Sequence, residues 1–216
     1  MVYGPPGSCY NHLVSKESQT GVIMSNNINF LLSRTRRNHA LEHATIHMLS
    51  EEHKNFSAQG NSNHRGFYLN IYGDISEEQV RAAVDEAYQR MKAGQHHLAV
   101  HPNCGTVLLT TAAMGALASQ TAFGLEQRRQ GRQTMDMNVF LNGLPGAILA
   151  GVLSLILSRP VGMALQEKLT TEGDLGNLVV VSVKRIKPSL ITRIFQLLLT
   201  PGKDLQVRAY RVETAG

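Results

Sequence analysis

The sequence contains few aromatic residues and few cysteines, and this scarcity argues against several classes of protein. It contains no tryptophan, six phenylalanines and six tyrosines among 216 residues, and only two cysteines, Cys9 and Cys104. Two cysteines so far apart argue against a disulfide framework and suit a reducing compartment. The net charge is +5, but the basic residues are scattered and no nucleic-acid-binding motif is present, so we expect no nucleic-acid partner. A basic start followed by an apolar run is also absent, and we therefore expect no secretory signal.

Charge is missing altogether from two long runs, residues 105–125 and 137–158. Each run has about the 20 residues that a helix needs to cross a bilayer. We therefore predict a transmembrane helical hairpin over residues 104–159, and a hairpin buried in a soluble core is the alternative. Small residues in the first run favour close helix packing, either within the hairpin or in a homodimer.

The remaining segments predict an α+β fold. In this fold, the N- and C-terminal segments together form a small mixed α/β soluble domain, which the two-helix transmembrane hairpin interrupts. Residues 1–27, which are largely polar and contain glycine and proline near their start, are predicted to be a disordered extension. Residues 28–103 and 160–216 are predicted to be the two halves of the domain.

Hydrophobic periodicity predicts the elements of each half. The first half is expected to contain a histidine-rich helix at 28–53, a polar loop up to about residue 65, a strand at 67–72, a helix capped by Ser76 and ending near residue 92, and a strand at 97–101. The second half is expected to contain strands at 178–183 and 205–212. Between these strands lies an amphipathic segment, residues 188–200, that packs on the membrane surface or on the sheet.

The motif His-x-x-Glu-His at residues 39–43 is the main chemical signal. On a helix, residues four apart share one face, so His39 and His43 can bind one metal ion. Glu42 lies beside them, where it can accept a proton from a metal-bound water. The pattern predicts a site for zinc, or for another divalent metal, that performs hydrolysis. The alternative is a helix that presents a polar face to water.

The third protein ligand that a catalytic zinc site requires is left open by the sequence. One candidate is His101, which the end of a strand can bring close to the helix. Other candidates are the downstream acids Glu77, Glu78 and Glu86, since the inverted peptidase pattern takes its third ligand from a downstream glutamate. His47 lies one turn beyond the motif, but three ligands along one straight helix rarely converge on one ion.

A second set of reactive groups lies at residues 101–106. Asn103 is predicted to cap the first apolar helix, with Cys104 in its first turn, where the helix dipole lowers the pKa of a thiol. His101 is then placed to act as the base of a Cys/His nucleophile pair. Equally, Cys104 can complete a metal site with His39 and His43. The remaining interpretation is a tight turn in which Cys104 is a small buried residue.

Four segments of the chain resemble a family of small membrane proteins from cyanobacteria and related bacteria. They include the motif NHALEHATIH at residues 38–47 and lie at residues 36–47, 65–68, 97–106 and 174–176. The resemblance covers roughly residues 34–183 and implies two membrane spans beside a small soluble domain. The family has no assigned activity, so the resemblance implies no catalytic residue. At His39, Glu42 and His43 alone, the chain also resembles the inverted zinc peptidases.

Together these observations predict an integral protein of the bacterial inner or thylakoid membrane, with its soluble domain on the cytoplasmic side. The expected function is that of a membrane-anchored, zinc-dependent hydrolase of the peptidase type. Glu42 is its base, and a peptide or a membrane protein is its substrate or partner. The alternative is a non-enzymatic assembly or scaffold factor of the membrane that binds a metal or a porphyrin through His43 or His47.

Overall fold

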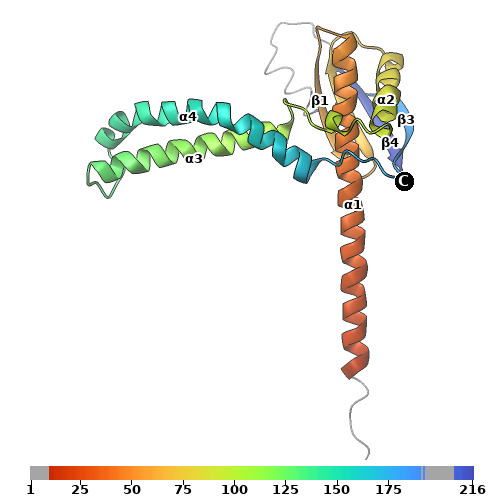
Figure 1. The fold of residues 1–216 in the computed structure, drawn as a ribbon, viewed down its shortest axis with the longest axis horizontal. Coiled ribbons are helices and arrows are strands. Elements are labelled where there is room, and N and C mark those ends of the chain that lie inside the picture. Colours follow the sequence, from red (N-terminus) through yellow and green to blue (C-terminus); the bar gives the residue numbers. More distant parts are fainter. Residues whose placement is uncertain (1–9, 191, 193–206) are drawn as a thin grey trace, which may run out of the picture.

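The computed structural model describes residues 10–190, 192 and 207–216, with side chains from residue 28 onward. The described residues form an α+β body, from which a two-helix hairpin and the first part of a long helix project (Figure 1). The prediction of an α+β fold is confirmed. The amphipathic segment predicted at residues 188–200 falls almost entirely outside the described residues.

Helix α1 (Tyr10–Glu52) is the longest element and carries the histidine motif. Between Tyr10 and Glu52 the sequence contains no proline and a single glycine, Gly21, so no residue in this stretch breaks a helix. The helix predicted from residue 28 therefore begins earlier. The expectation of a disordered extension over residues 1–27 is corrected from Tyr10 onward.

The sheet has four antiparallel strands in the order β1-β2-β4-β3. Its central pair joins the two halves of the chain, because β2 comes before the hairpin and β4 comes after it. The strands predicted near residues 67, 178 and 205 are confirmed to within a few residues. The bounds of the four strands are β1 (Ser57–Asn63), β2 (Gly66–Tyr72), β3 (Val179–Ile186) and β4 (Val207–Ala215).

Two segments differ from the sequence-based expectation. The predicted polar loop contains β1, an edge strand of small and polar residues that pairs with β2 through its backbone and therefore lacks an apolar signal. The predicted strand at residues 97–101 is instead a short 3-10 helix, η1 (His96–Ala99). This turn buries Leu98 and leaves the carbonyls of Ala99 and Val100 outside any strand pairing, where histidines of α1 bind them.

Helices α1 and α2 (Glu77–Lys92) cover one face of the sheet. Ser76 caps α2 as predicted, because its side chain accepts from the backbone N–H of Gln79 and the Gln79 side chain accepts from the backbone N–H of Ser76. The core between the helices and the sheet contains fully buried side chains from both halves of the chain, including Leu41, Leu49, Phe67, Ile71, Val84, Leu178 and Tyr210.

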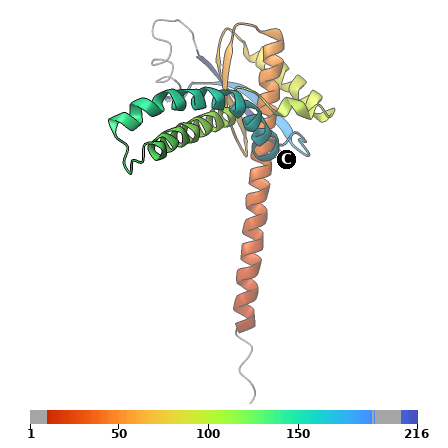
Figure 2. The same ribbon diagram turned by 60° about the vertical axis from the view of Figure 1, so that its left-hand side comes forward.

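The hairpin consists of α3 (Gly105–Arg129) and α4 (Met137–Leu165), followed by a π-helical turn, η2 (Gln166–Thr170). Both helices are long and apolar enough to cross a membrane, and only 6% and 22% of their apolar windows are buried inside the protein. A core helix of a soluble protein would be mostly buried. The hairpin projects away from the body in both views and runs crosswise to α1 (Figure 2).

Small residues of α4 face α3 and let the two helices approach closely. A Cβ atom at Gly162 would lie 2.8 Å from Cα of Val107. The hydroxyl oxygens of Thr111 and Ser158 are 2.7 Å apart across the hairpin. The small residues that let the helices approach thus lie mainly on α4 and not in the first run, where a Cβ atom at Gly115 would meet no described atom within 4 Å, and the homodimer stays a prediction.

We expect Gly162→Val to destabilise the hairpin by about 1–3 kcal/mol, because the new side chain meets the backbone of α3. Gly115→Val is the matched control, since a Cβ atom at Gly115 meets no described atom within 4 Å. Thermal unfolding of the two detergent-purified variants, followed by circular dichroism, measures the difference. Equal unfolding temperatures would contradict this packing.

Candidate metal centre

Three potential metal ligands meet where α1 passes the start of the hairpin. The ligand atoms of His39, His43 and Cys104 all lie within 4.8 Å of one another. The two histidines are one turn apart on α1, and their ring centroids are 4.3 Å apart. The structure therefore brings together the two histidines of the motif, and it adds the cysteine that the sequence offered as one alternative for the third position.

Backbone carbonyls from both ends of the hairpin orient the two imidazoles. Nδ1 of His39 is 2.9 Å from the carbonyl oxygen of Thr170, and Nδ1 of His43 is 2.7 Å from that of Ala99. A carbonyl only accepts, so each Nδ1 carries the proton and each Nε2 is the atom left for a metal. This arrangement of carbonyl, imidazole and open Nε2 is the one that protein metal sites use to fix a histidine ligand.

Cys104 itself caps α3, whereas the sequence placed the cap at Asn103. Its sulfur accepts from the backbone N–H of Thr106 at 3.5 Å and lies 3.4 Å from Nε2 of His39. Burial alone raises the pKa of the Cys104 thiol, but hydrogen bonds to His39 and His43 and to the backbone of Thr106 lower it to about 5. At neutral pH the sulfur is therefore a thiolate, which is the form that binds metal ions.

The same contact changes the protonation of His39. Burial alone lowers the pKa of this imidazole, but the hydrogen bond with Cys104 and the nearby charge of Glu42 raise it above its usual value. In the metal-free protein, the cysteine and this histidine thus favour a thiolate and an imidazolium. A divalent ion would displace the Nε2 proton, so metal binding at this site is expected to release protons.

Glu42 is buried beside the three candidate ligands, and residues of strand β1 fix its position. Its Oε2 accepts a hydrogen bond of 2.6 Å from the hydroxyl of Ser62. A methyl group at Gly60 would overlap the carboxylate, so β1 approaches Glu42 closely only because residue 60 has no side chain. Burial raises the pKa of Glu42, while the Ser62 hydrogen bond and the charges of His43 and His39 oppose this shift.

A cavity of about 510 Å³ joins these groups. Its walls come from the motif face of α1, from four consecutive residues of β1, and from the segment that enters α3. The residues that line it are His39, Glu42, His43, Ile46, Ala58, Gln59, Gly60, Asn61, His101, Asn103, Cys104, Gly105, Thr106 and Leu108. A small substrate group can therefore reach the ligand atoms and Glu42 from one space.

His101 and His47 lie close to the cluster but are not part of it. Nδ1 of His101 accepts from the backbone N–H of Asn103, and its ring centroid is 5.9 Å from that of His43 and 5.0 Å from that of His47. Burial, with His47 and His43 nearby, lowers the pKa of His101 to about 4. Nε2 of His47 bonds to the carbonyl of Val100 at 3.0 Å. Cys104, and not the candidate His101, thus lies within ligand distance of His39 and His43, because the turn after His101 carries the cysteine towards α1.

The acids proposed as third ligands are placed elsewhere. Glu77, Glu78 and Glu86 are on α2, and none of them lines the cavity. Glu77 bonds to Arg81, and Glu86 bonds to Arg90 at 2.6 Å. Hydrogen bonds from its own backbone N–H and from Ser76 lower the pKa of Glu78. Glu78 and Glu86 are exposed and Glu77 is half-buried, because α2 turns its apolar side towards α1 and the sheet.

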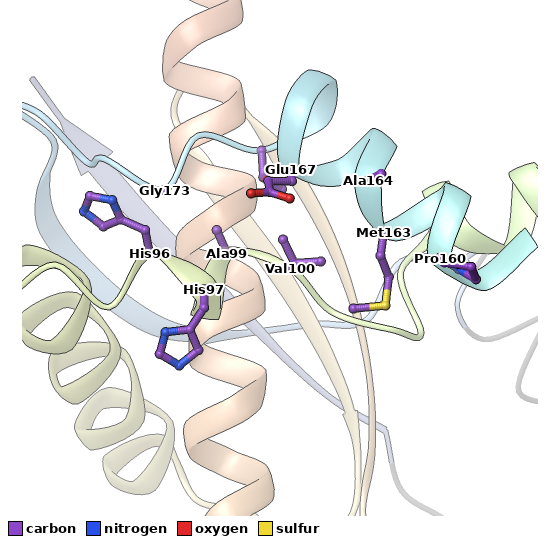
Figure 3. Close-up of a pocket in the computed structure, with 10 residues that line it drawn as sticks. His96, His97, Ala99, Val100, Pro160, Met163, Ala164, Glu167 and Gly173 are labelled. Atoms are coloured by element: carbon purple, nitrogen blue, oxygen red, sulfur yellow. The ribbon is translucent and has the colours of Figure 1, made fainter.

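A second hollow, of about 660 Å³, lies between η1 and the end of α4. It is lined by His96, His97 and Glu167 together with apolar residues, but the two imidazoles point in different directions, away from Glu167 (Figure 3). The two imidazoles and the carboxylate thus do not converge on one point (Figure 3). The candidate centre therefore lies in the smaller cavity.

Sequence reasoning missed the parts of the site that have no side-chain signature. The carbonyls of Ala99 and Thr170 come from the backbone, which any residue supplies. Ser62 and Gly60 belong to β1, a strand that the sequence did not reveal. The run of small and polar residues just before the aromatic strand β2 is compatible with an edge strand, but it does not distinguish one from a loop.

Comparisons with known proteins agree with the sequence-based resemblance at the level of the family. A family model described as "Domain of unknown function (DUF6391)" matches residues 34–183. An uncharacterized protein of Picosynechococcus sp. (strain PCC 7002) is 35% identical over 97 residues, which are 38% of this chain and 46% of that relative. The match thus spans about half the length of this curated relative. No solved structure matches the chain.

We expect the detergent-purified protein to bind about one divalent ion per chain. With Cys104 as the proposed third ligand, Cys104→Ala should lower metal affinity by roughly tenfold or more, whereas His101→Ala should change it much less. Elemental analysis and competition with a chelating dye measure this difference. A loss in His101→Ala with full metal retention in Cys104→Ala would contradict the assignment of the third ligand.

Proposed function

The chain belongs to the family described as "Domain of unknown function (DUF6391)", and we propose that it is a membrane-anchored, metal-dependent hydrolase. The observation that carries the proposal is that a buried carboxylate, Glu42, shares one cavity with His39, His43 and Cys104. Three protein ligands with a base beside them form the arrangement of a catalytic zinc site, whereas a structural site usually has four ligands.

The donor set fits zinc or a similar divalent ion. Two imidazole Nε2 atoms and one thiolate are ligands that zinc accepts in tetrahedral sites, and the fourth position would be left for water. When bound, the ion would acidify that water and polarise a carbonyl group. His39 and His43 arrive oriented by backbone carbonyls, so little reorganisation is required for them to bind.

Glu42 is the proposed general base. Ser62 holds one carboxylate oxygen and leaves the other to take a proton. Burial raises the pKa of Glu42 above that of an exposed glutamate, which makes it a stronger base than usual. General bases act best when their pKa approaches the working pH.

The position of β1 favours a peptide as substrate. Among the described residues, β1 pairs with β2 alone, so its outer edge presents backbone groups without a strand partner. Its residues Ala58 to Asn61 line the cavity beside Glu42. An extended peptide that pairs with this edge would pass its own carbonyl groups in front of the ligands.

Membrane anchoring is the second part of the proposal. The outward sides of α3 and α4 expose large apolar residues along their length, among them Leu109, Leu117, Leu125, Leu149, Leu153 and Ile156. A soluble protein rarely exposes so continuous an apolar surface. Lipid is the solvent that this surface fits.

We expect Glu42→Gln to retain the metal and to lose roughly 10²–10⁴-fold in turnover, because the amide no longer accepts the proton. The zinc-loaded protein in lipid nanodiscs is assayed with fluorescently labelled, unfolded casein, and its metal content is determined in parallel. Glu86→Gln is the matched control, since this glutamate of α2 bonds to Arg90 outside the cavity. Unchanged turnover in Glu42→Gln would disprove Glu42 as the base, whereas absence of turnover in the wild-type protein would favour the scaffold role.

A thiol hydrolase is a second candidate, because the Cys104 sulfur lies 3.4 Å from His39 Nε2. The predicted pair of this cysteine with His101 is replaced in the structure by a pair with His39. A thiol enzyme would keep its activity after the metal is removed with phenanthroline, whereas the metallohydrolase would lose it and recover it when zinc is added back.

A further inference from the structure

One face of α1 carries exposed apolar residues just before the metal ligands. Leu32 is 57% exposed and Ile28 is 56% exposed. Helix periodicity places both on the face that carries His39 and His43 further along. Phe30 is 50% exposed but lies on the opposite face, where its ring contacts the Arg34 guanidinium.

This face of α1 points towards the base of the hairpin. Leu32 lines one hollow together with Thr106, in the first turn of α3, and Leu169, in η2. Leu169 is itself 63% exposed. Exposed apolar side chains of α1 and η2 thus lie beside the base of the hairpin, around a hollow that polar residues such as Ser33 and Arg36 also line.

The arrangement of the helices indicates how the apolar face of α1 would be oriented relative to a bilayer. Figures 1 and 2 show that the hairpin leaves the body crosswise to α1, while α2 lies on the other side of α1. If the hairpin spans a bilayer, then α1 runs along the membrane surface, with its Leu32 face towards the lipid. A helix in this position buries its apolar side at the boundary between headgroups and acyl chains.

We propose that α1 is an in-plane membrane helix. The face that carries Ile28 and Leu32 rests on the bilayer, and this position places the mouth of the cavity around His39, His43 and Cys104 at the lipid surface. The inference rests on the proposed membrane anchoring. Leu108, which lines the metal cavity, is 65% exposed on the first turns of α3. The rim of the cavity is therefore lipid-facing, and the substrates that fit it are segments that emerge from the bilayer.

The test uses the absence of tryptophan from the chain, because a single introduced tryptophan reports on its own position. Leu32→Trp, Phe30→Trp and Leu153→Trp are each reconstituted as full-length protein in liposomes that contain brominated phospholipid, which quenches tryptophan in contact with it. We expect strong quenching for Leu153→Trp, in the hairpin. We also expect Leu32→Trp to be quenched at least about twofold more than Phe30→Trp, with a blue-shifted emission.

The controls separate the alternatives. Ile28→Trp repeats the measurement on the same face if Leu32→Trp fails to fold. Quenching of Leu153→Trp without a difference between positions 32 and 30 overturns the in-plane helix and leaves the anchoring intact. A blue shift at position 32 without quenching indicates a protein partner, such as a second copy, and also overturns the inference. Absence of quenching at Leu153→Trp overturns both the anchoring and the inference.

Discussion

Both ends of the hairpin are fastened to one face of α1, and the rest of the structure depends on that attachment. The carbonyl of Ala99, before α3, and the carbonyl of Thr170, after α4, each accept from a histidine of the motif. The buried side chain of Gln166 bonds to the backbone N–H and carbonyl of His101 and so closes the base of the hairpin. The contact between His43 and Ala99 is buried, where leaving one group unpaired costs about 1–3 kcal/mol, and the other contacts are partly buried.

A second buried polar anchor fixes α1 against the sheet. Asn38 is fully buried; its amide nitrogen donates to the carbonyl of Asn63, at the end of β1, and its oxygen accepts from the hydroxyl of Thr214, in β4. One residue therefore ties α1 to an edge strand and a central strand. Because it directly precedes the motif, it sets the rotation of α1 at which Glu42 faces β1 and the two histidines face the hairpin.

The candidate site and the base of the hairpin thus share residues. Cys104 is both the cap of α3 and a proposed metal ligand, so the chain enters the apolar hairpin at the site of the proposed chemistry. The hydrophobic residues of α3 and α4 supply an exposed apolar surface, while the motif face of α1 supplies charge and polarity at their base. A hydrolase built in this way would act at the boundary between membrane and water.

Local patterns in the sequence were sufficient to predict the long helices and three of the four strands. They were also sufficient to predict that His39, Glu42 and His43 lie close together on one helix. Each of these depends on periodicity or on spacing within a single element, which the chain carries along its own length. Strand β1 was not predicted, because an edge strand is held by backbone pairing, which has no side-chain signature.

The candidate for the third ligand depends on the tertiary structure. Cys104 is 65 residues from His39, and its approach depends on the turn at residues 101–103 and on the docking of both ends of the hairpin. The sequence by itself determined which groups were available for chemistry. Only the folded chain decided which of them meet, because contacts between distant segments depend on how whole elements pack and not on any local pattern.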